Sequence, residues 1–515
     1  MKRNVLEYLE ASAERYPGKI ALVDEVKTCT YAEFLAYSRK VGSQLAARIP
    51  IRRPVAVLAE KGVDILCTFM GIVQAGCFYS LLNPEFPLSR LEQIVSVLKP
   101  ALIITDADHR EMADKLVTGD RILMMEELLE GEAKAEEGEK EAQEEKEAEE
   151  LLKSVRSRII DTDPLYANFT SGSTGVPKGV LVSHRSVLDF IDIFAPMFGI
   201  DHTDVVGNQA PFDFDVSVKD IYSAMKTGAE LVIIPKRLFS MPSDLLDFIC
   251  NHQVTTMIWA VSALCLINTF HGLDYRTPDR VKRILFSGEV MPAKHLKAWM
   301  DHLPEAEFVN LYGPTEITCN CTYHRISRQR DYAGGIPVGK PFPNEDVFLL
   351  GEDDREVTEP GVRGEICVRG SALALGYFGN REQTDKAFPI NPLNPWYPER
   401  IYRTGDLGSY NEERELVFCG RKDFQIKYKG HRIELEEIER AISAAEGVER
   451  CCVLFQEAKQ KLYGFYTGSI DKKQLHAALK ETLPVYMIPG ILRKIESFPL
   501  TKNGKIDRKR LLEEA

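Results

Sequence analysis

The chain has 515 residues, 44% of them hydrophobic, and a formal net charge of −12. That length exceeds what one hydrophobic core normally serves and predicts two or more domains, while the hydrophobic fraction is ordinary for a globular protein. No apolar run is as long as a membrane span, the start lacks the apolar region of a signal peptide, and the acidic charge argues against a nucleic-acid partner, so we expect a cytoplasmic protein.

The first 125 residues alternate between helical and strand patterns. Apolar residues from Leu6 to Tyr16 recur at roughly helical spacing, and Thr30 precedes Glu33 as in a helix-initiating capping box. Short apolar runs at 54–58 and 101–105 predict buried strands. Helices that alternate with buried strands predict an α/β fold with a largely parallel sheet.

The acidic excess is concentrated in one segment. Residues 131–150 contain ten Glu and three Lys, so more than half of the net charge lies there. The wider tract, about 129–153, is rich in helix formers and has little to bury, which is typical of a solvated helix or of disorder. We interpret it as an exposed insert.

A glycine-rich loop follows this tract. Thr170-Ser-Gly-Ser-Thr-Gly175 and Pro177-Lys-Gly179 lie between two apolar runs, which predicts two strands joined by a loop. Backbone N–H groups, hydroxyls and a lysine in such a loop can hold phosphates, although a plain surface turn is the alternative. The spacing differs from that of the Walker loop.

Acidic side chains lie among aromatic ones in Asn208-Gln-Ala-Pro-Phe-Asp-Phe-Asp-Val-Ser-Val-Lys-Asp-Ile-Tyr222. Such carboxylates either cap a helix or bind a cation, and the residues alone favour capping. Apolar runs at 283–286 and 308–311 predict core strands. The second leads into Tyr312-Gly-Pro-Thr-Glu316, where ligand sites of α/β proteins lie, and an aromatic ring, a hydroxyl and a carboxylate there suit a purine, a phosphoryl oxygen and Mg²⁺. A simple turn is the alternative.

The C-terminal part contains two further polar features. Residues 420–439 read as a turn, an alternating strand and a charged helix, and the bland interpretation is a basic surface hairpin. Asn503-Gly504 predicts a tight turn that presents Lys505, which by itself is an ordinary solvated lysine.

Taken in order, these motifs resemble those of the adenylate-forming enzymes, the superfamily of acyl-CoA synthetases, luciferases and peptide-synthetase adenylation domains. The wording of 208–220 and of Leu285-Phe-Ser-Gly-Glu-Val-Met-Pro292 resembles the D-alanine–carrier protein ligases most. The resemblance implies an α/β fold with a large N-terminal adenylation domain, 1–422, with parallel and mixed sheets. It also implies a small, mobile α+β domain, 423–515, that carries the catalytic lysine.

The resemblance further implies ATP and Mg²⁺ as cofactors and an amino acid that is activated as aminoacyl-AMP. The acyl group then passes to the phosphopantetheine thiol of a separate carrier protein, since no carrier domain is recognisable in this chain. Lys505, Thr315 and Glu316 would be catalytic, with Glu316 on Mg²⁺, Asp423 would be the hinge, and Gly430 would line the path of the thiol. The ATP and AMP site would comprise Thr170, Ser171, Gly172, Ser173, Thr174, Gly175, Lys178, Gly288, Glu289, Asn310, Tyr312, Gly313, Asp406 and Arg421.

In the same family an aspartate, here Asp215, pairs with the ammonium of an amino-acid substrate. The other pocket positions implied are Lys219, Ile258, Leu285, Ser287, Leu311, Cys319 and Asn320. D-alanine ligases usually have Met and Cys where this chain has Lys219 and Ser287. The substrate is then D-alanine, another small amino acid or an acidic one whose side chain pairs with Lys219, unless that lysine pairs with Asp213 or Asp215. The alternatives are an acyl-CoA or aryl-acid ligase and a non-catalytic nucleotide-binding homologue.

Overall fold

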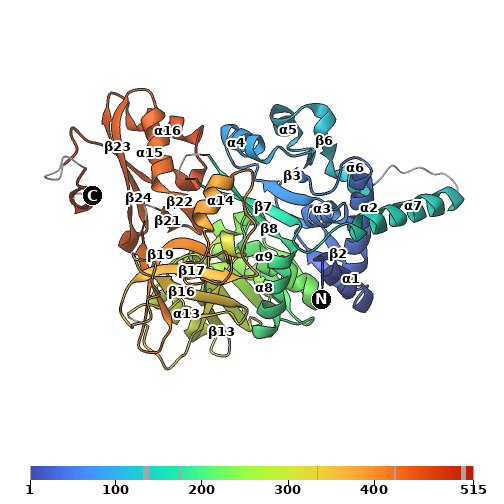
Figure 1. Ribbon diagram of the computed structural model, residues 1–515, viewed down its shortest axis with the longest axis horizontal. Helices are drawn as coiled ribbons and strands as arrows, with labels where there is room; N and C mark the ends of the chain where they lie inside the picture. The colour runs from blue at the N-terminus through green and yellow to red at the C-terminus, as the bar shows by residue number, and fades with distance from the viewer. Residues whose placement is uncertain are drawn as a thin grey trace. The chain divides into compact units, whose positions relative to one another are not determined.

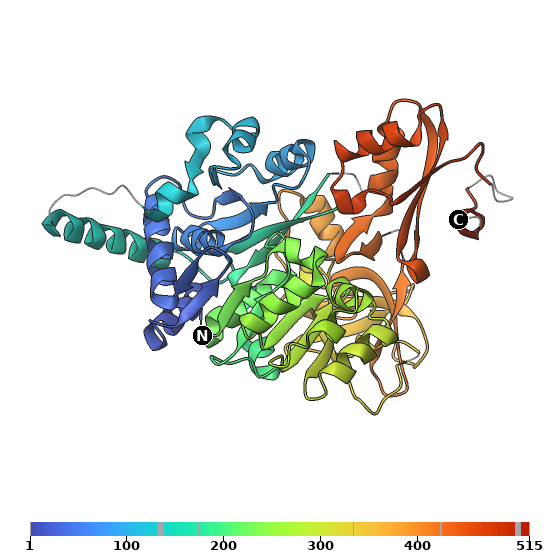
Figure 2. The same ribbon diagram turned by 180° about the vertical axis from the view of Figure 1, so that it is seen from behind.

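The computed structural model describes residues 2–130, 138–172, 176–332, 334–422, 425–499 and 506–513. Contacts between Cα atoms divide the chain into two compact units (Figures 1 and 2). Unit 1 comprises Met1–Leu82, Lys99–Asn168 and Val180–Lys422, and unit 2 comprises Asn83–Leu98, Phe169–Gly179 and Asp423–Ala515. The predicted roles of Ser173, Thr174, Gly175, Asp423 and Lys505 concern positions outside the described residues.

The largest sheet of unit 1 has a parallel centre. Its described strands, in spatial order, are β15 (Lys340–Pro341), β14 (Thr322–Arg325), β13 (Glu307–Tyr312), β12 (Arg283–Ser287), β11 (Thr256–Ala260), β9 (Val205–Asn208), β10 (Glu230–Ile233), β1 (Ile20–Val23) and β2 (Thr28–Thr30). Parallel pairing joins β1 to β10, β10 to β9, β9 to β11, β11 to β12 and β12 to β13, whereas β14 and β2 are antiparallel additions.

Two further sheets complete unit 1. The second sheet has, in spatial order, β18 (Gly376–Tyr377), β8 (Lys178–Ser183), β7 (Pro164–Thr170), β4 (Phe78–Leu82), β3 (Pro54–Leu58), β5 (Leu102–Thr105) and β6 (Ile122–Met124). The third is antiparallel, with β16 (Glu345–Leu350), β17 (Gly364–Gly370), β19 (Tyr402–Tyr410) and β20 (Leu416–Arg421).

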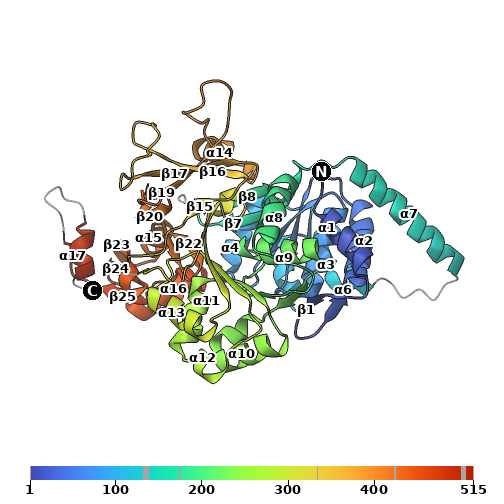
Figure 3. The same cartoon turned by 90° about the horizontal axis from the view of Figure 1, so that it is seen from below.

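Helices connect and cover these strands. Those described in unit 1 are α1 (Leu6–Arg15), α2 (Tyr31–Ala46), α3 (Val63–Gln74), α5 (Arg110–Leu116), α6 (Met125–Glu130), α7 (Gly138–Ser157), α8 (His184–Met197), α9 (Val216–Thr227), α10 (Pro242–Asn251), α11 (Val261–Thr269), α12 (Gly272–Tyr275), α13 (Ala293–His302) and α14 (Arg381–Ala387). Figure 3 shows α8 and α9 side by side, and the two helices are in contact.

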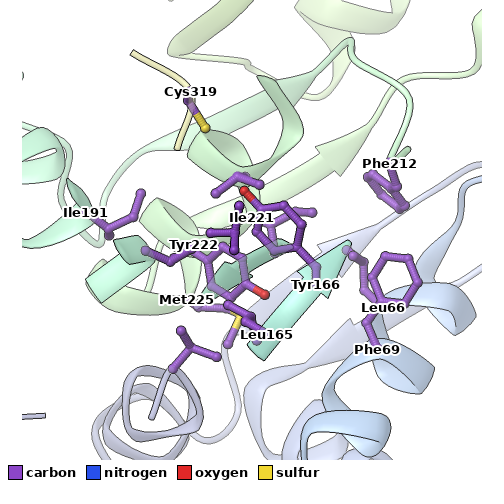
Figure 4. Packing of buried hydrophobic residues seen from close by; sticks show 14 of the residues in the cluster. Leu66, Phe69, Leu165, Tyr166, Ile191, Phe212, Ile221, Tyr222, Met225 and Cys319 are labelled. Carbon is purple, nitrogen blue, oxygen red and sulfur yellow. The ribbon is translucent and has the colours of Figure 1, made fainter. Parts of the chain in front are cut away.

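One hydrophobic cluster joins strands of the first two sheets through α3, α8 and α9. Figure 4 shows Leu66 and Phe69 of α3, Tyr166 of β7 and Tyr222 of α9 within it. Cys319, which follows β13, belongs to the same cluster. The core therefore extends up to the segment that holds several of the predicted substrate-binding residues.

The acidic tract ends in a helix. α7 spans Gly138–Ser157 and extends away from the rest of unit 1 (Figure 3). From position 143 to 153 its side chains are mostly exposed, whereas Val155 is buried and Arg156 lies near Glu7 and Glu10 of α1. The last turn of α7 therefore anchors the helix on the body of the unit. The solvated-helix alternative is confirmed for 143–153.

Unit 2 has its own small core. Its described elements are α4 (Leu88–Leu98), β21 (Gln425–Tyr428), β22 (His431–Glu434), α15 (Leu435–Ala444), β23 (Val448–Gln456), β24 (Lys461–Gly468), α16 (Lys472–Lys480), β25 (Ile491–Lys494) and α17 (Arg508–Glu513). Ile438 and Ile442 of α15 pack with Val453 and Leu475. A buried ion pair between Arg90 and Glu437, 2.5 Å from Nη1 to Oε1, holds α4 to α15.

The α/β class and the early elements predicted from sequence are confirmed. The capping box is present, because the Thr30 hydroxyl accepts the Glu33 N–H and Glu33 accepts the Thr30 N–H. Residues 425–434 form two antiparallel strands, so the single alternating strand was wrong in detail and the hairpin, given as the bland interpretation, is confirmed. Lys429 and Gly430 turn the chain between them with φ of 52° and 80°, which is the two-residue hairpin geometry.

Candidate active site

Four parallel strands bring the predicted substrate residues to one edge of the large sheet. β9, β11, β12 and β13 run in the same direction, so their carboxyl ends lie together. Ser287 is the last residue of β12, and Tyr312 is the last of β13. In α/β proteins this edge is where ligands bind.

Asp215 stands immediately before α9. It occupies the N-cap position, but its side chain forms no capping hydrogen bond with the first turn of the helix. The capping role that the residues alone favoured is therefore not realised by Asp215. Asp215 is buried, with 7% of the residue exposed, which is a costly position for a charge unless a cationic partner compensates it. The Cys319 thiol donates to the backbone oxygen of Asp215 at 3.0 Å, which holds this residue against the segment after β13.

Lys219 lies one turn further along α9 and is fully buried. Its Nζ donates to Asn320 Oδ1 at 2.6 Å and to Ser287 Oγ at 3.5 Å. The ion pair with Asp213 or Asp215 that the sequence allowed is not formed within the described part of the chain. Burial lowers the pKa of Lys219, and Cys319, Asp215 and Asp220 act in the opposite direction.

The backbone after β13 is built for close approach. Thr318 and Cys319 both have left-handed φ, 54° and 79°, which is uncommon for residues other than glycine and typical of functional sites. A Cβ at Gly313 would lie 2.5 Å from Cα of Asn320, so only glycine fits there. This tight return places the Cys319 thiol on Asp215 and the Asn320 amide on Lys219.

A second cluster joins three residues predicted to bind ATP. The Tyr312 hydroxyl donates to Asp406 Oδ2 at 2.6 Å, and the Arg421 guanidinium pairs with Asp406 Oδ1. Asp406 lies on β19 opposite Arg421 on β20. Burial, reinforced by the Asp406 carboxylate, raises the pKa of Tyr312, which stays a neutral donor. Residues 94 and 15 positions apart in the chain thus form one polar group.

Glu316 is the predicted magnesium ligand and lies in a short 3₁₀ helix, Thr315–Ile317. It is fully buried, and its Oε1 accepts the Tyr377 hydroxyl at 2.7 Å. Its carboxylate is an oxygen donor of the kind that Mg²⁺ prefers, and Mg²⁺ commonly uses one or two carboxylates together with substrate phosphates. Among the described residues no group of three or more His, Cys, Asp and Glu could hold a metal ion.

The other predicted residues of unit 1 are placed as follows. Ile258, Leu285 and Leu311 are buried on β11, β12 and β13, and Gly288, with φ of 94°, turns the chain after β12. Glu289 Oε2 accepts the Ser262 N–H at 3.1 Å, and the Asn310 amide donates to the Pro337 carbonyl at 2.9 Å.

Sequence reasoning missed two polar partners in the same region. The first is Tyr377 on β18, whose hydroxyl donates to Glu316 Oε1. Asp220 is fully buried and accepts from the Asn208 amide at 2.7 Å, and burial raises the pKa of Asp220 to about 7 against the effect of that bond and of Lys219. The acidic residue two places after Ser-Val was visible in the sequence, but its partner on β9 was not.

The described part of the glycine-rich loop belongs to unit 2. The Ser171 hydroxyl donates to the Arg432 carbonyl at 2.8 Å, and the Arg440 guanidinium donates to the Gly172 carbonyl at 3.4 Å. These two hydrogen bonds link the loop to β22 and α15. Thr170 and Lys178 lie at the ends of β7 and β8, as the pattern of strand, loop and strand predicts. Gly430 lies in the β21–β22 turn.

This fold places polar groups at the carboxyl ends of parallel strands, as in α/β proteins that bind ligands there. A family model described as AMP-binding enzyme matches residues 9–378, and the chain belongs to that family. The resemblance inferred from the motifs is confirmed. Within the described part of the chain, none of the helices combines the length and the apolar character needed to cross a bilayer.

The chain is also similar to individual proteins over nearly its whole length. The chain is 30% identical to the D-alanine–D-alanyl carrier protein ligase of Bacillus licheniformis over 99% of both chains. It is 31% identical to bacitracin synthase 1 of the same species over 98% of this chain, and it spans only 9% of the length of that synthase. It likewise spans 8% of tyrocidine synthase 3 of Brevibacillus parabrevis.

Solved structures agree on the fold. A peptide-synthetase protein containing adenylation and PCP domains, bound to a vinylsulfonamide inhibitor, superimposes with a TM-score of 0.81 at 23% identity, covering 99% of this chain and 84% of that one. The o-succinylbenzoate CoA synthetase of Bacillus subtilis superimposes equally well, with a TM-score of 0.81 at 20% identity, covering 99% and 98%. Because a peptide-synthetase protein and a CoA synthetase share this fold, the fold alone does not identify a substrate.

Proposed function

We propose that this protein activates an amino acid with ATP and transfers the aminoacyl group to the phosphopantetheine thiol of a carrier protein. The first step yields aminoacyl-AMP and pyrophosphate, and the second yields a thioester. The substrate is D-alanine, another small amino acid or an acidic one, and the reaction takes place in the cytoplasm. The 30% identity to a D-alanine–carrier protein ligase along both chains supports this reaction type.

The observation that carries the proposal is the buried carboxylate of Asp215 at the strand ends. It does not cap α9, and it lies beside Cys319 and near Lys219, in the region where α/β enzymes bind ligands. An anionic side chain in this place suits a substrate that has an ammonium group. A fatty or aryl acid has no such group and would offer the Asp215 carboxylate no ammonium to pair with.

The first step joins two anions, so the protein must align them and offset their charge. Lys505 would bridge the substrate carboxylate and the α-phosphate, while Thr315 would donate to a phosphoryl oxygen. The glycine-rich loop with Lys178 would hold the leaving pyrophosphate, and Asp406 with Arg421 would bind the ribose hydroxyls. Mg²⁺, held by Glu316, would supply positive charge to the phosphate oxygens.

The second step needs access for a thiol. The C-terminal domain, 423–515, would turn at Asp423, withdraw Lys505 and present the face of Gly430. The β21–β22 hairpin supports this role, because Gly430 in its two-residue turn has no side chain that would obstruct a thiol. Basic residues of this hairpin, Lys427, Lys429 and Arg432, would suit an acidic carrier protein.

An acyl-CoA or aryl-acid ligase is the second candidate, because a CoA synthetase has the same fold. ATP–pyrophosphate exchange with a panel of amino acids and of aryl and fatty acids separates the two. We expect exchange with amino acids and not with their des-amino analogues. Exchange that depends only on non-amino acids would overturn the proposal, and no exchange with any acid would favour a non-catalytic homologue.

Asp215→Asn tests the role of the carboxylate directly. We expect kcat/KM for the amino acid to fall about 100-fold or more, because the substrate ammonium loses its charged partner. Asp192→Asn on the surface of α8 is the matched control and should leave exchange unchanged. If Asp215→Asn retains full exchange while ATP binding and folding are intact, the ammonium does not bind there.

A further inference from the structure

Lys219 is a buried cation without a buried counterion in contact. Its side chain is fully inaccessible, and both of its hydrogen-bond acceptors, Asn320 Oδ1 and Ser287 Oγ, are neutral. Within the described ranges it forms no ion pair with a carboxylate. An ammonium has three N–H donors, so two bonds leave one donor available. Such a group is costly unless something supplies negative charge to it.

The carboxylates nearby supply that charge only in part. Asp220 is committed to the Asn208 amide, and because burial raises the pKa of Asp220 to about 7, it is only partly ionised at neutral pH. Asp215 is the remaining anion near Lys219 on the same helix start. Without a bound substrate, the negative charge of Asp215 therefore compensates the positive charge of Lys219 through space.

A bound substrate changes this balance. If the ammonium of an amino acid takes Asp215, as the proposed function requires, Lys219 loses its compensating charge. A substrate with an apolar side chain would then leave a buried, uncompensated cation in the site. A substrate with a second carboxylate would restore neutrality, with one charge pair at Asp215 and another at Lys219.

We propose that Lys219 makes this enzyme selective for an amino acid with an acidic side chain. The substrate ammonium would pair with Asp215, the side-chain carboxylate would pair with Lys219, and the α-carboxylate would be free to attack the α-phosphorus of ATP and displace pyrophosphate. Asn320 and Ser287 would position Lys219, because they hold its Nζ from two different strand-end segments. The inference rests on the proposed amino-acid adenylation and specifies its substrate class.

The unmodified protein provides the first test. ATP–pyrophosphate exchange is measured with both enantiomers of aspartate and glutamate, with the isosteric amides asparagine and glutamine, and with alanine and leucine. We expect an acidic amino acid to exceed its own amide by about 100-fold or more in kcat/KM, since the amide keeps the shape and loses the charge. Equal or greater exchange with an amide, alanine or leucine overturns the inference while leaving amino-acid adenylation intact.

Lys219→Met provides the second test. We expect kcat/KM for the acidic amino acid to fall about 100-fold or more and exchange with uncharged amino acids to rise, because the cation that penalises them is gone. Lys226→Met is the matched control, since Lys226 lies on the same helix and pairs with Asp192. Thermal unfolding and ATP binding verify that the variants are folded. Unchanged preference for the acidic substrate in folded Lys219→Met contradicts the inference, and absence of exchange with every amino acid in the unmodified protein contradicts the proposed function itself.

Discussion

Burial of ionisable side chains decides how single residues behave in unit 1. Lys219, Asp220 and Glu316 are all fully inaccessible, and each is held by a neutral hydrogen-bond partner. A buried charge costs several kcal/mol unless it is compensated, so such residues are retained where they bind something or where they titrate. At the strand-end site we expect the buried residues to bind something. Elsewhere in the unit a buried residue titrates, and its titration has a measurable effect on stability.

Glu345, at the start of β16, is a buried carboxyl group outside the site. Burial raises the pKa of Glu345 to about 8, against the opposing effect of the Ala372 N–H that it accepts. The unfolded chain would lose this proton near the usual value of 4.5. Between these two values the folded state binds more protons, so stability falls as the pH rises through this interval.

Glu345→Gln removes this titration and keeps an oxygen that can accept the Ala372 N–H. We expect the variant to match the parent near about pH 5 and to be more stable by on the order of 2 kcal/mol near about pH 9. Chemical denaturation of both proteins across this range measures the difference. A difference that does not grow with pH would show that Glu345 ionises normally.

At the residue scale the sequence predicts which residues form the site better than it predicts which side chains hydrogen-bond to each other. Asp215, Lys219 and Cys319 were recognisable from motif positions, and the structure brings all three together. The acceptors of Lys219 are 68 and 101 positions away along the chain, and no local pattern indicates them. They depend on the parallel order of β9, β11, β12 and β13, which only the fold specifies.

Local signals are sufficient where an element is stabilised by its neighbours in sequence. The start of α2 is such a case, since Thr30 and Glu33 satisfy each other's backbone N–H groups. We expect Thr30→Ala to destabilise unit 1 by about 1 kcal/mol, because a backbone donor of the first turn loses its acceptor. Chemical denaturation measures this loss.

Thr28→Ala, at an exposed position of the neighbouring strand β2, serves as the control for the cap and should cost less than about 0.5 kcal/mol. Equal losses for the two variants would mean that the capping box contributes nothing specific to α2.

For the hairpin of unit 2, local signals left two alternatives open, one continuous strand and a hairpin. Residues 425–434 alternate as one strand would, and Lys429-Gly430 is a weaker turn signal than Asn-Gly. The turn forms because Gly430 accepts a φ of 80° at no steric cost and Lys429 tolerates 52°. The loss of one continuous strand is offset by the ladder between β21 and β22.

At the scale of the whole molecule, the order of segments along the chain does not reveal which segments belong to which unit. Unit 2 includes Asn83–Leu98 and Phe169–Gly179 besides the C-terminal part. The Arg90–Glu437 pair that joins α4 to α15 spans 347 positions, so composition and periodicity do not predict it. The α7 insert is the opposite case, because its charge and lack of apolar residues predict an exposed segment directly.

The proposed function assigns the two half-reactions to different parts of the C-terminal domain. Lys505→Ala should reduce aminoacyl-AMP formation about 100-fold or more, since the charge that aligns the two anions is lost. Supplied with preformed aminoacyl-AMP, the same variant should still load a carrier protein at a near-normal rate.

Gly430→Ala should show the reverse behaviour. A Cβ at a φ of 80° strains the β21–β22 turn, on the path proposed for the thiol. Pyrophosphate exchange should then persist while thioester formation falls about 10-fold or more. Lys429→Gly, which the same turn accepts without strain, is the control. If both substitutions impair both half-reactions equally, one fixed arrangement of the site serves the whole cycle, and rotation at Asp423 is not needed to explain it.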